Sequence, residues 1–203
     1  MTKRLKGTAM KQERSIETRN KLIRAGRVIF LKNGFANATM TQVIKEAGVG
    51  YGTAYVYFKN KDDLFYVIIE ETILGLQQVG SMQFTPRSKE EAIAIIEKQA
   101  TLFIEEGLRQ KEMLRVVHEA IGCSTIIAKK WQQARHFFES SIARDVRYAQ
   151  EHNLASRLFD AQDVAKLWFS LNEKALWDCI FEDNCDATMS ASLISHFYIA
   201  GLY

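Results

Sequence analysis

Proline is nearly absent from this sequence. Its 203 residues include a single proline, Pro86, whereas an average usage of about 5% would give about ten. Because proline is excluded from helix interiors, this scarcity is typical of a chain built almost entirely of helices and argues against an all-β fold. The length fits one or two domains. A hydrophobic content of 47% with 25% charged residues argues against disorder.

Cysteine and metal-binding patterns are also scarce. The three cysteines, Cys123, Cys179 and Cys185, are an odd number without close paired spacing. This pattern excludes a disulfide framework and argues against a cysteine-based zinc site. The four histidines show no short metal spacing, and no glycine-rich phosphate loop is present. We therefore expect no metal and no cofactor.

Long apolar runs are missing as well. The longest one, residues 64–69, has six residues, whereas a membrane span needs about 20. The chain also lacks a charged and then apolar leader with a small-residue cleavage site. These two absences predict a soluble, cytoplasmic protein without a membrane partner.

The net charge of +3 is the sum of a basic N-terminal part and an acidic remainder. Residues 1–61 carry 13 Lys and Arg against 3 acids, a net charge of +10, while residues 62–203 carry 14 against 21, a net charge of −7. This contrast predicts a polyanion-binding module joined to a part that does not bind polyanions. Nucleic acid is the leading partner, and an anionic membrane surface is the second candidate. Uneven surface charge without function is the remaining alternative.

Apolar residues recur at helical spacing through most of the chain and predict about nine helices without a strand. Thr39 with Gln42, and Ser88 with Glu91, form capping boxes that start two of them. Gly34 is expected to end the first helix. The predicted helices cover residues 15–33, 40–47, 50–58, 61 onward, 89–107, 110–121, 127–149, 163–181 and 190–202.

Two short helices joined by a glycine turn, after a longer first helix, form the pattern of a helix-turn-helix. The second short helix of such a motif can enter the major groove of DNA, which is about 12 Å wide. Gly50 and Gly52 leave its start without side-chain bulk, so its backbone amides can approach a phosphate. Thr39 and Thr41 offer hydroxyls for a second phosphate contact.

The second short helix interleaves aromatic and hydroxyl groups suited to phosphates and thymine methyls. Tyr55 and Phe58 are explained at least as well by core packing. Lys61 opposes the dipole of the helix that it begins, which favours a phosphate partner over mere solvation. The groups expected to contact DNA in and after this helix are Tyr51, Thr53, Tyr55, Tyr57 and Lys61.

The stretch from Thr39 to Phe65, TMTQVIKEAGVGYGTAYVYFKNKDDLF, closely resembles the DNA-binding signature of TetR-type transcriptional repressors. Upstream, Phe30 and the pair at 34–35 match as well, so the resemblance covers roughly residues 15–66. It departs from the family pattern at Gly50, where serine is usual, and at Ala54, where a larger apolar residue is usual.

The resemblance implies an all-α homodimer that binds an inverted-repeat operator in double-stranded DNA and is released by a small-molecule effector. It divides the chain into a basic flexible arm at 1–14, a helix-turn-helix domain at 15–61, and an effector-binding and dimerisation domain at 62–203. By position it assigns DNA contacts to Thr39, Gly50, Tyr51, Gly52, Thr53, Tyr55, Tyr57 and Lys61.

Aromatic residues in the C-terminal two thirds are candidates for an apolar effector cavity, although ordinary core packing explains each of them singly. They favour a hydrophobic effector, such as an acyl chain or an aromatic compound. The residues selected as its lining are Phe103, His118, Trp131, Phe138 and Trp168. Wide apolar faces on the last two helices, with Trp168, Trp177, Phe197 and Tyr198, are expected to form the dimer contact.

Two other classes of function remain open. A helical enzyme would use Cys123 or Cys179 with a distant histidine, but the chain has neither a G-x-S-x-G motif nor a clustered pair of carboxylates, so we do not expect an enzyme. An architectural or membrane-surface protein would use the basic end without sequence choice. Such a protein would bind any DNA, or anionic vesicles, equally well.

Overall fold

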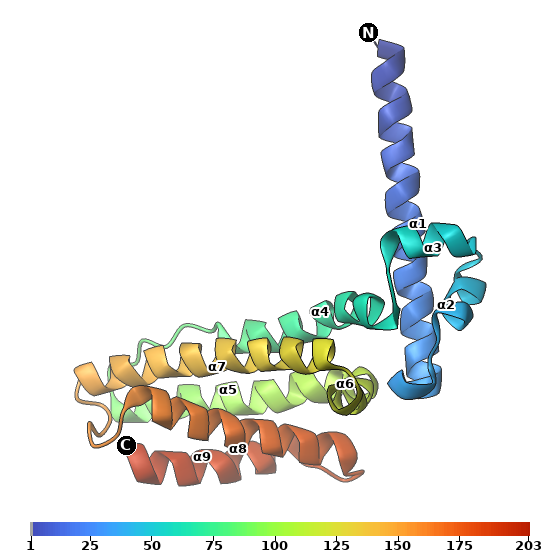
Figure 1. Cartoon of the computed structure of the whole chain (residues 1–203). Helices are drawn as coiled ribbons and strands as arrows, with labels where there is room; N and C mark the ends of the chain where they lie inside the picture. The colour runs from blue at the N-terminus through green and yellow to red at the C-terminus, as the bar shows by residue number, and fades with distance from the viewer. Residues whose placement is uncertain (1) are drawn as a thin grey trace. The chain divides into compact units, whose positions relative to one another are not determined.

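The computed structural model describes residues 2–203, with side chains described from residue 12 onward. Within this part of the chain there are nine α-helices and no strand, which confirms the predicted all-α class (Figure 1). The helices are α1 Thr2–Asn37, α2 Met40–Ala47, α3 Tyr51–Tyr57, α4 Lys61–Gly80, α5 Lys89–Arg109, α6 Lys111–Cys123, α7 Thr125–Glu151, α8 Ala161–Phe181 and α9 Ala187–Leu202.

The chain forms two compact units, of which the first comprises Met1–Glu71 and Val116–Lys129. Helices α1, α2 and α3 pack against one another in this unit (Figure 1). Phe30, Phe35 and Phe65 form an aromatic cluster with ring centroids 4.6 to 5.9 Å apart, and all three are buried. Burial of these rings fixes the first turns of α4 against α1.

The first unit extends beyond the predicted domain of residues 15–61. The apolar run at the start of α4 is part of it, because Leu64 and Phe65 are fully buried there. Residues 2–14, predicted as a flexible arm, continue α1 as helix. This stretch has no proline and is rich in lysine, arginine and other good helix formers, which accounts for the difference.

The second unit comprises Thr72–Arg115 and Lys130–Tyr203. In it, α5 packs along both α8 and α9, and α7 lies beside them (Figure 1). Aromatic contacts join α7 to its neighbours: the ring centroids of Phe103 and Phe138 are 5.4 Å apart, and those of Phe138 and Phe169 are 4.9 Å apart. The core of this unit is therefore rich in aromatic side chains.

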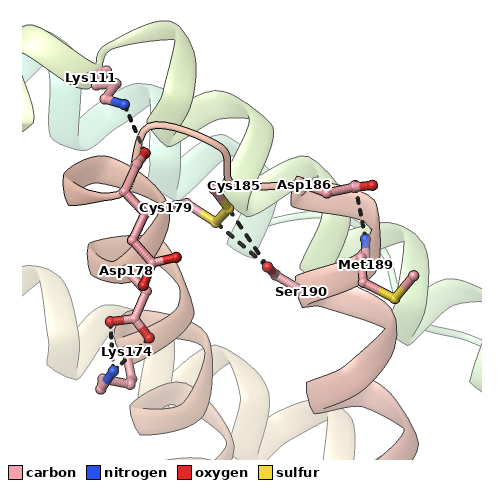
Figure 2. The surroundings of a disulfide bond; sticks show 9 residues. Lys111, Lys174, Asp178, Cys179, Cys185, Asp186, Met189 and Ser190 are labelled. Carbon is pink, nitrogen blue, oxygen red and sulfur yellow. Dashed lines mark hydrogen bonds and ion pairs between the residues drawn. A yellow bond between two sulfur atoms is a disulfide. The ribbon is translucent and has the colours of Figure 1, made fainter.

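The expectation of no disulfide framework is wrong for one pair of cysteines. Cys179 near the end of α8 is bonded to Cys185 in the following loop, with the two Cα atoms 4.9 Å apart, and both sulfur atoms lie beside the Ser190 hydroxyl (Figure 2). The chain turns back here from α8 into α9, which brings residues six positions apart together. Because Cys179 is also buried, it is not available as the nucleophile of an enzyme. Cys123 is free and exposed.

Candidate nucleic-acid interface and effector cavity

Helix α2 presents two threonine hydroxyls at its N-terminus. The Thr39 side chain accepts a hydrogen bond from the Gln42 amide at 3.3 Å, and the Gln42 side chain accepts one from the Thr39 amide at 2.9 Å. This confirms the predicted capping box. The Thr39 hydroxyl acts only as an acceptor in this box, so its hydrogen is available to a phosphate. Thr39 and Thr41 are both exposed.

A glycine turn sets α3 against α2. Gly48 has a φ of 63°, in the left-handed region, and its N–H donates to the carbonyl groups of Ile44 and Lys45, as expected for a helix stop. On the inner side of α3, Ala54 is fully buried and Phe58 is 3% exposed. Phe58 is therefore a core residue, and the small side chain of Ala54 is accommodated in the packing under α3.

The outer side of α3 is open to solvent. Tyr51 is 56% exposed, Tyr55 47% and Val56 80%, and Gly50, Gly52 and Thr53 are exposed as well. Sequence reasoning missed Val56, although its position four residues after Gly52 puts it on the same helix face. Two exposed methyl groups at this point suit contact with a thymine methyl. Tyr57 is half-buried, and its hydroxyl lies 2.9 Å from the Ser15 hydroxyl of α1.

Lys61 has a role that the sequence did not reveal. Its ammonium group donates to the backbone carbonyl oxygens of Phe35 at 2.8 Å, Ala36 at 3.0 Å and Ala38 at 3.2 Å. It also lies 4.7 Å from the centroid of the Phe35 ring. These three bonds use all the hydrogens of an ammonium group. They hold the short last part of α1, which follows the non-helical backbone of Gly34, together with its link to α2; we call this stretch the connection between the main part of α1 and α2. Lys61 therefore positions Thr39, whether or not it also contacts DNA.

Glu119 of α6 binds the amide groups of the same connection, whose carbonyl groups Lys61 binds. Its carboxylate accepts hydrogen bonds from the backbone amides of Phe35 at 2.8 Å and Ala36 at 2.9 Å. Gly34 makes room for this contact: its φ is 75°, and a Cβ atom there would lie 2.6 Å from a Glu119 oxygen. We call Lys61, Glu119 and the backbone of residues 34–38 the connection clamp.

Gly50 leaves α3 without a side-chain cap. Its φ of −72° and ψ of 148° suit any residue, and a Cβ atom there would meet only the Thr53 hydroxyl, at 3.7 Å. We expect Gly50→Ser to be more stable to unfolding than Gly50→Ala by about 1 kcal/mol, because serine can accept a bond from an amide of the first turn and alanine cannot. Urea unfolding of the two variants measures this difference. Equal stabilities would show that α3 gains nothing from a cap.

The second unit contains a cavity of about 50 Å³ with aromatic walls. Phe103, Phe138 and Trp168, three of the predicted effector residues, line it together with Phe169. Its polar groups come from Gln99, Asp145 and Asn172.

The other two predicted effector residues do not line this cavity. Trp131 is buried, and its indole N–H donates to the Glu173 carboxylate at 2.7 Å. That carboxylate also pairs with the Arg135 guanidinium. His118 is exposed on α6 within the first unit. The candidate effector set therefore narrows to Phe103, Phe138 and Trp168.

Helices α8 and α9 expose a continuous apolar surface. Leu167 is 66% exposed, Met189 68%, Leu193 58% and Phe197 69%. The three residues on α9 are spaced by four, so they form one stripe along the helix. Beside the stripe is a groove of about 400 Å³ between the two helices, lined by Phe159, Asp163, Val164, Leu167, Leu171, Phe197, Tyr198, Gly201 and Leu202. Of the residues predicted for the dimer contact, Trp168 is buried and Phe197 lies on this surface.

Among the described residues, no three His, Cys, Asp or Glu side chains lie together in a way that could hold a metal ion. None of the helices from residue 2 to the C-terminus is long and apolar enough to cross a membrane.

The helix-turn-helix region matches known proteins by sequence. The family described as bacterial regulatory proteins, tetR family, matches residues 22–67. An HTH-type transcriptional regulator of Staphylococcus aureus strain bovine RF122 / ET3-1 is 34% identical over 59 residues, which are 29% of this chain and 32% of that protein. The counterpart in strain USA300 is 35% identical over 57 residues, 28% and 31% of the two chains. The match thus spans about a third of these relatives.

Solved structures resemble nearly the whole chain. A TetR-family transcriptional regulator from Syntrophomonas wolfei has a TM-score of 0.70 at 16% identity, covering 90% of this chain and 93% of that one. SmeT, the repressor of the Stenotrophomonas maltophilia multidrug efflux pump SmeDEF, has a TM-score of 0.69 at 19% identity, covering 91% and 89%. At such identities the likeness establishes a shared fold.

Proposed function

We propose that this chain, whose residues 22–67 match the family described as bacterial regulatory proteins, tetR family, is a repressor that binds an inverted-repeat operator as a homodimer. The observation that carries the proposal is the outer side of α3, where Tyr51, Tyr55 and Val56 are exposed while Ala54 and Phe58 anchor the helix. A helix held in this way can present one face to a major groove. A regulator that binds bacterial DNA would act in the cytoplasm.

The proposed contacts divide into two kinds. Hydroxyls at the start of α2 and backbone amides at the start of α3 would bind phosphates and fix the position of the protein on the duplex. Side chains on the outer side of α3 would read base edges. The proposed phosphate set is Thr39, Thr41, Gly50 and Gly52, and the proposed reading set is Tyr51, Thr53, Tyr55, Val56 and Tyr57. Lys61 acts mainly through the connection clamp.

A second copy of the chain would cover the apolar surface of α8 and α9. Exposed apolar patches of this extent mark interaction sites in soluble proteins. A twofold axis would pack the stripe of one copy against the same stripe of the other copy, which gives a closed dimer. The dimer would then carry two α3 helices to half-sites about 34–36 Å apart, one turn of DNA.

An effector in the cavity of the second unit would control DNA binding. SmeT, which shares the fold, has been solved in complex with triclosan, and this supports a small, hydrophobic ligand here as well. Helix α4 runs from the first unit into the second, so a ligand-dependent shift of α4 would alter the spacing of the two α3 helices. To change the population from 1:99 to 99:1, the effector must prefer one state by about 5.5 kcal/mol.

We expect Tyr51→Ala to weaken binding to an operator selected from random DNA by about tenfold, because one lost contact to a base or phosphate costs about 1–3 kcal/mol. Leu74→Ala is a suitable control, since Leu74 is 57% exposed on α4 and lies outside α2 and α3. Fluorescence anisotropy with a labelled duplex measures both affinities. If the two variants bind the operator equally well, α3 is not the reading helix.

A further inference from the structure

The cavity of the second unit combines aromatic walls with one carboxylate. Asp145 of α7 lines the cavity, and its side chain is only 16% exposed. Among the described lining residues there is no lysine or arginine to neutralise it. Asn172 adds a carbonyl oxygen, because its amide N–H donates to the Trp168 carbonyl at 2.9 Å and leaves the oxygen to accept. Asp145 is therefore the one charged group among the described residues that line the cavity.

The only ion pair of Asp145 in the described part of the chain is weak. The Arg144 Nε lies 3.5 Å from one Asp145 oxygen, but the Arg144 side chain is 64% exposed and also donates to the Ser141 hydroxyl at 2.8 Å. An ion pair that is this open to water contributes little. Asp145 also faces Tyr198 of α9 and Tyr203 at the C-terminus. Burial raises the pKa of both phenols and the charge of Asp145 raises it further, so both phenols stay neutral.

Holding this carboxylate costs folding stability. Burial raises the pKa of Asp145 to about 6, against the pull of Arg144. A raised pKa in the folded state means that the fold favours the protonated carboxyl group. The stability that the protonated Asp145 gives to the folded state is therefore lost as pH rises through about 6. Above that pH the cavity holds a charge that destabilises the protein. A charge with such a cost, inside a cavity, is a candidate for ligand binding.

The aromatic walls suit a positive charge. Phe138 and Phe169 stack with ring centroids 4.9 Å apart, and Phe103 meets both edge-on. The Arg135 guanidinium already lies 5.5 Å from the centroid of Phe169, so this ring interacts with a cation from the protein itself. Faces of aromatic rings attract cations through their quadrupoles.

We propose that the cavity binds a small organic ammonium ion, whose charged head pairs with Asp145 and whose apolar body lies against Phe103, Phe138 and Trp168. The volume of about 50 Å³ has room for about four water molecules, which corresponds to an alkylammonium ion of a few carbons. The inference rests on the proposed function in that this ion is the effector. It refines the expected hydrophobic ligand by adding a positive charge to it.

The test compares n-alkylammonium ions from ethyl to hexyl with alcohols and carboxylates of the same chain lengths, by calorimetry at pH 8. Asp145→Asn keeps the shape of the side chain and removes the charge. It should lower the affinity for the best ammonium ion at least about tenfold and leave alcohol binding unchanged. Arg144→Gln removes the competing cation and should raise that affinity. Opposite effects of neighbouring substitutions cannot come from a general loss of folding.

Three results would overturn the inference. The first is the absence of ammonium binding at millimolar concentrations, the second is equal binding of alcohols or carboxylates, and the third is unchanged ammonium affinity in Asp145→Asn. Operator affinity is measured on the same protein with and without the ion. If the ion binds in a way that depends on Asp145 but does not change the operator affinity, the ion is not the effector. Failure of operator binding alone, with ion binding intact, contradicts the proposed function and leaves the cavity assignment standing.

Discussion

Replacing Phe197 by glutamate is expected to convert the proposed dimer into a monomer and to lower operator affinity at least about a hundredfold. Phe197 is 69% exposed in the middle of the apolar surface of α8 and α9, so the substitution does not disturb the core of the unit. In the dimer, however, it would bury a charge against an apolar partner surface. The large loss of affinity follows because two linked half-site contacts become one.

Sedimentation velocity and anisotropy with the selected operator measure the two effects. Gln132→Glu adds the same single charge at an exposed position of α7 and should change neither. The prediction fails if Phe197→Glu sediments as a dimer. It also fails if the monomer binds the operator as tightly as the unaltered protein does.

Removing the carboxylate of the connection clamp should have the second-largest effect. In Glu119→Ala the backbone amides of Phe35 and Ala36 lose acceptors at 2.8 and 2.9 Å. Each unpaired donor costs about 1–3 kcal/mol when buried, and the site is partly open to water, so we expect the free energy of unfolding to fall by about 2 kcal/mol. Operator affinity should fall about tenfold, because the released segment carries Thr39.

Glu112→Ala provides the control on the same helix. Glu112 pairs with Arg115 at 3.4 Å but is 72% exposed, so its loss should cost under about 1 kcal/mol. Lys61→Met removes the other side of the clamp, and its effect should not be additive with that of Glu119→Ala, since both groups hold the same backbone. Equal costs for Glu119→Ala and Glu112→Ala, or strict additivity with Lys61→Met, would show that the clamp is not a unit.

Local signals in the sequence are sufficient for the helices after residue 14, although they do not indicate the helical extension of α1 over residues 2–14. Thr39 with Gln42 starts α2, Gly48 ends it, and Asn60 accepts a hydrogen bond from the Asp63 amide at 2.8 Å at the start of α4. Each of these features depends on residues within four positions of one another. Helix α3 could be located for the same reason, because its inner and outer sides follow from the helical period.

The groups that the sequence did not reveal depend on distant residues. Glu119 meets Phe35 across 84 positions, and Lys61 meets it across 26, so no local pattern shows either contact. No sequence pattern distinguishes Asp145 from the other acidic residues, because its position beside the aromatic rings of α5 and α8 depends on the packing of three helices. The link between Cys179 and Cys185 depends on the turn from α8 to α9, whose geometry the cysteine count cannot show.

A dimer that reads a DNA sequence should select its operator from a random pool of duplexes at about 150 mM salt, where binding by charge alone is weak because it falls steeply as salt rises. We expect this selection to enrich an inverted repeat with half-sites one helical turn apart. Folded protein, stripped of ligand by denaturation and refolding, that enriches no sequence would contradict it.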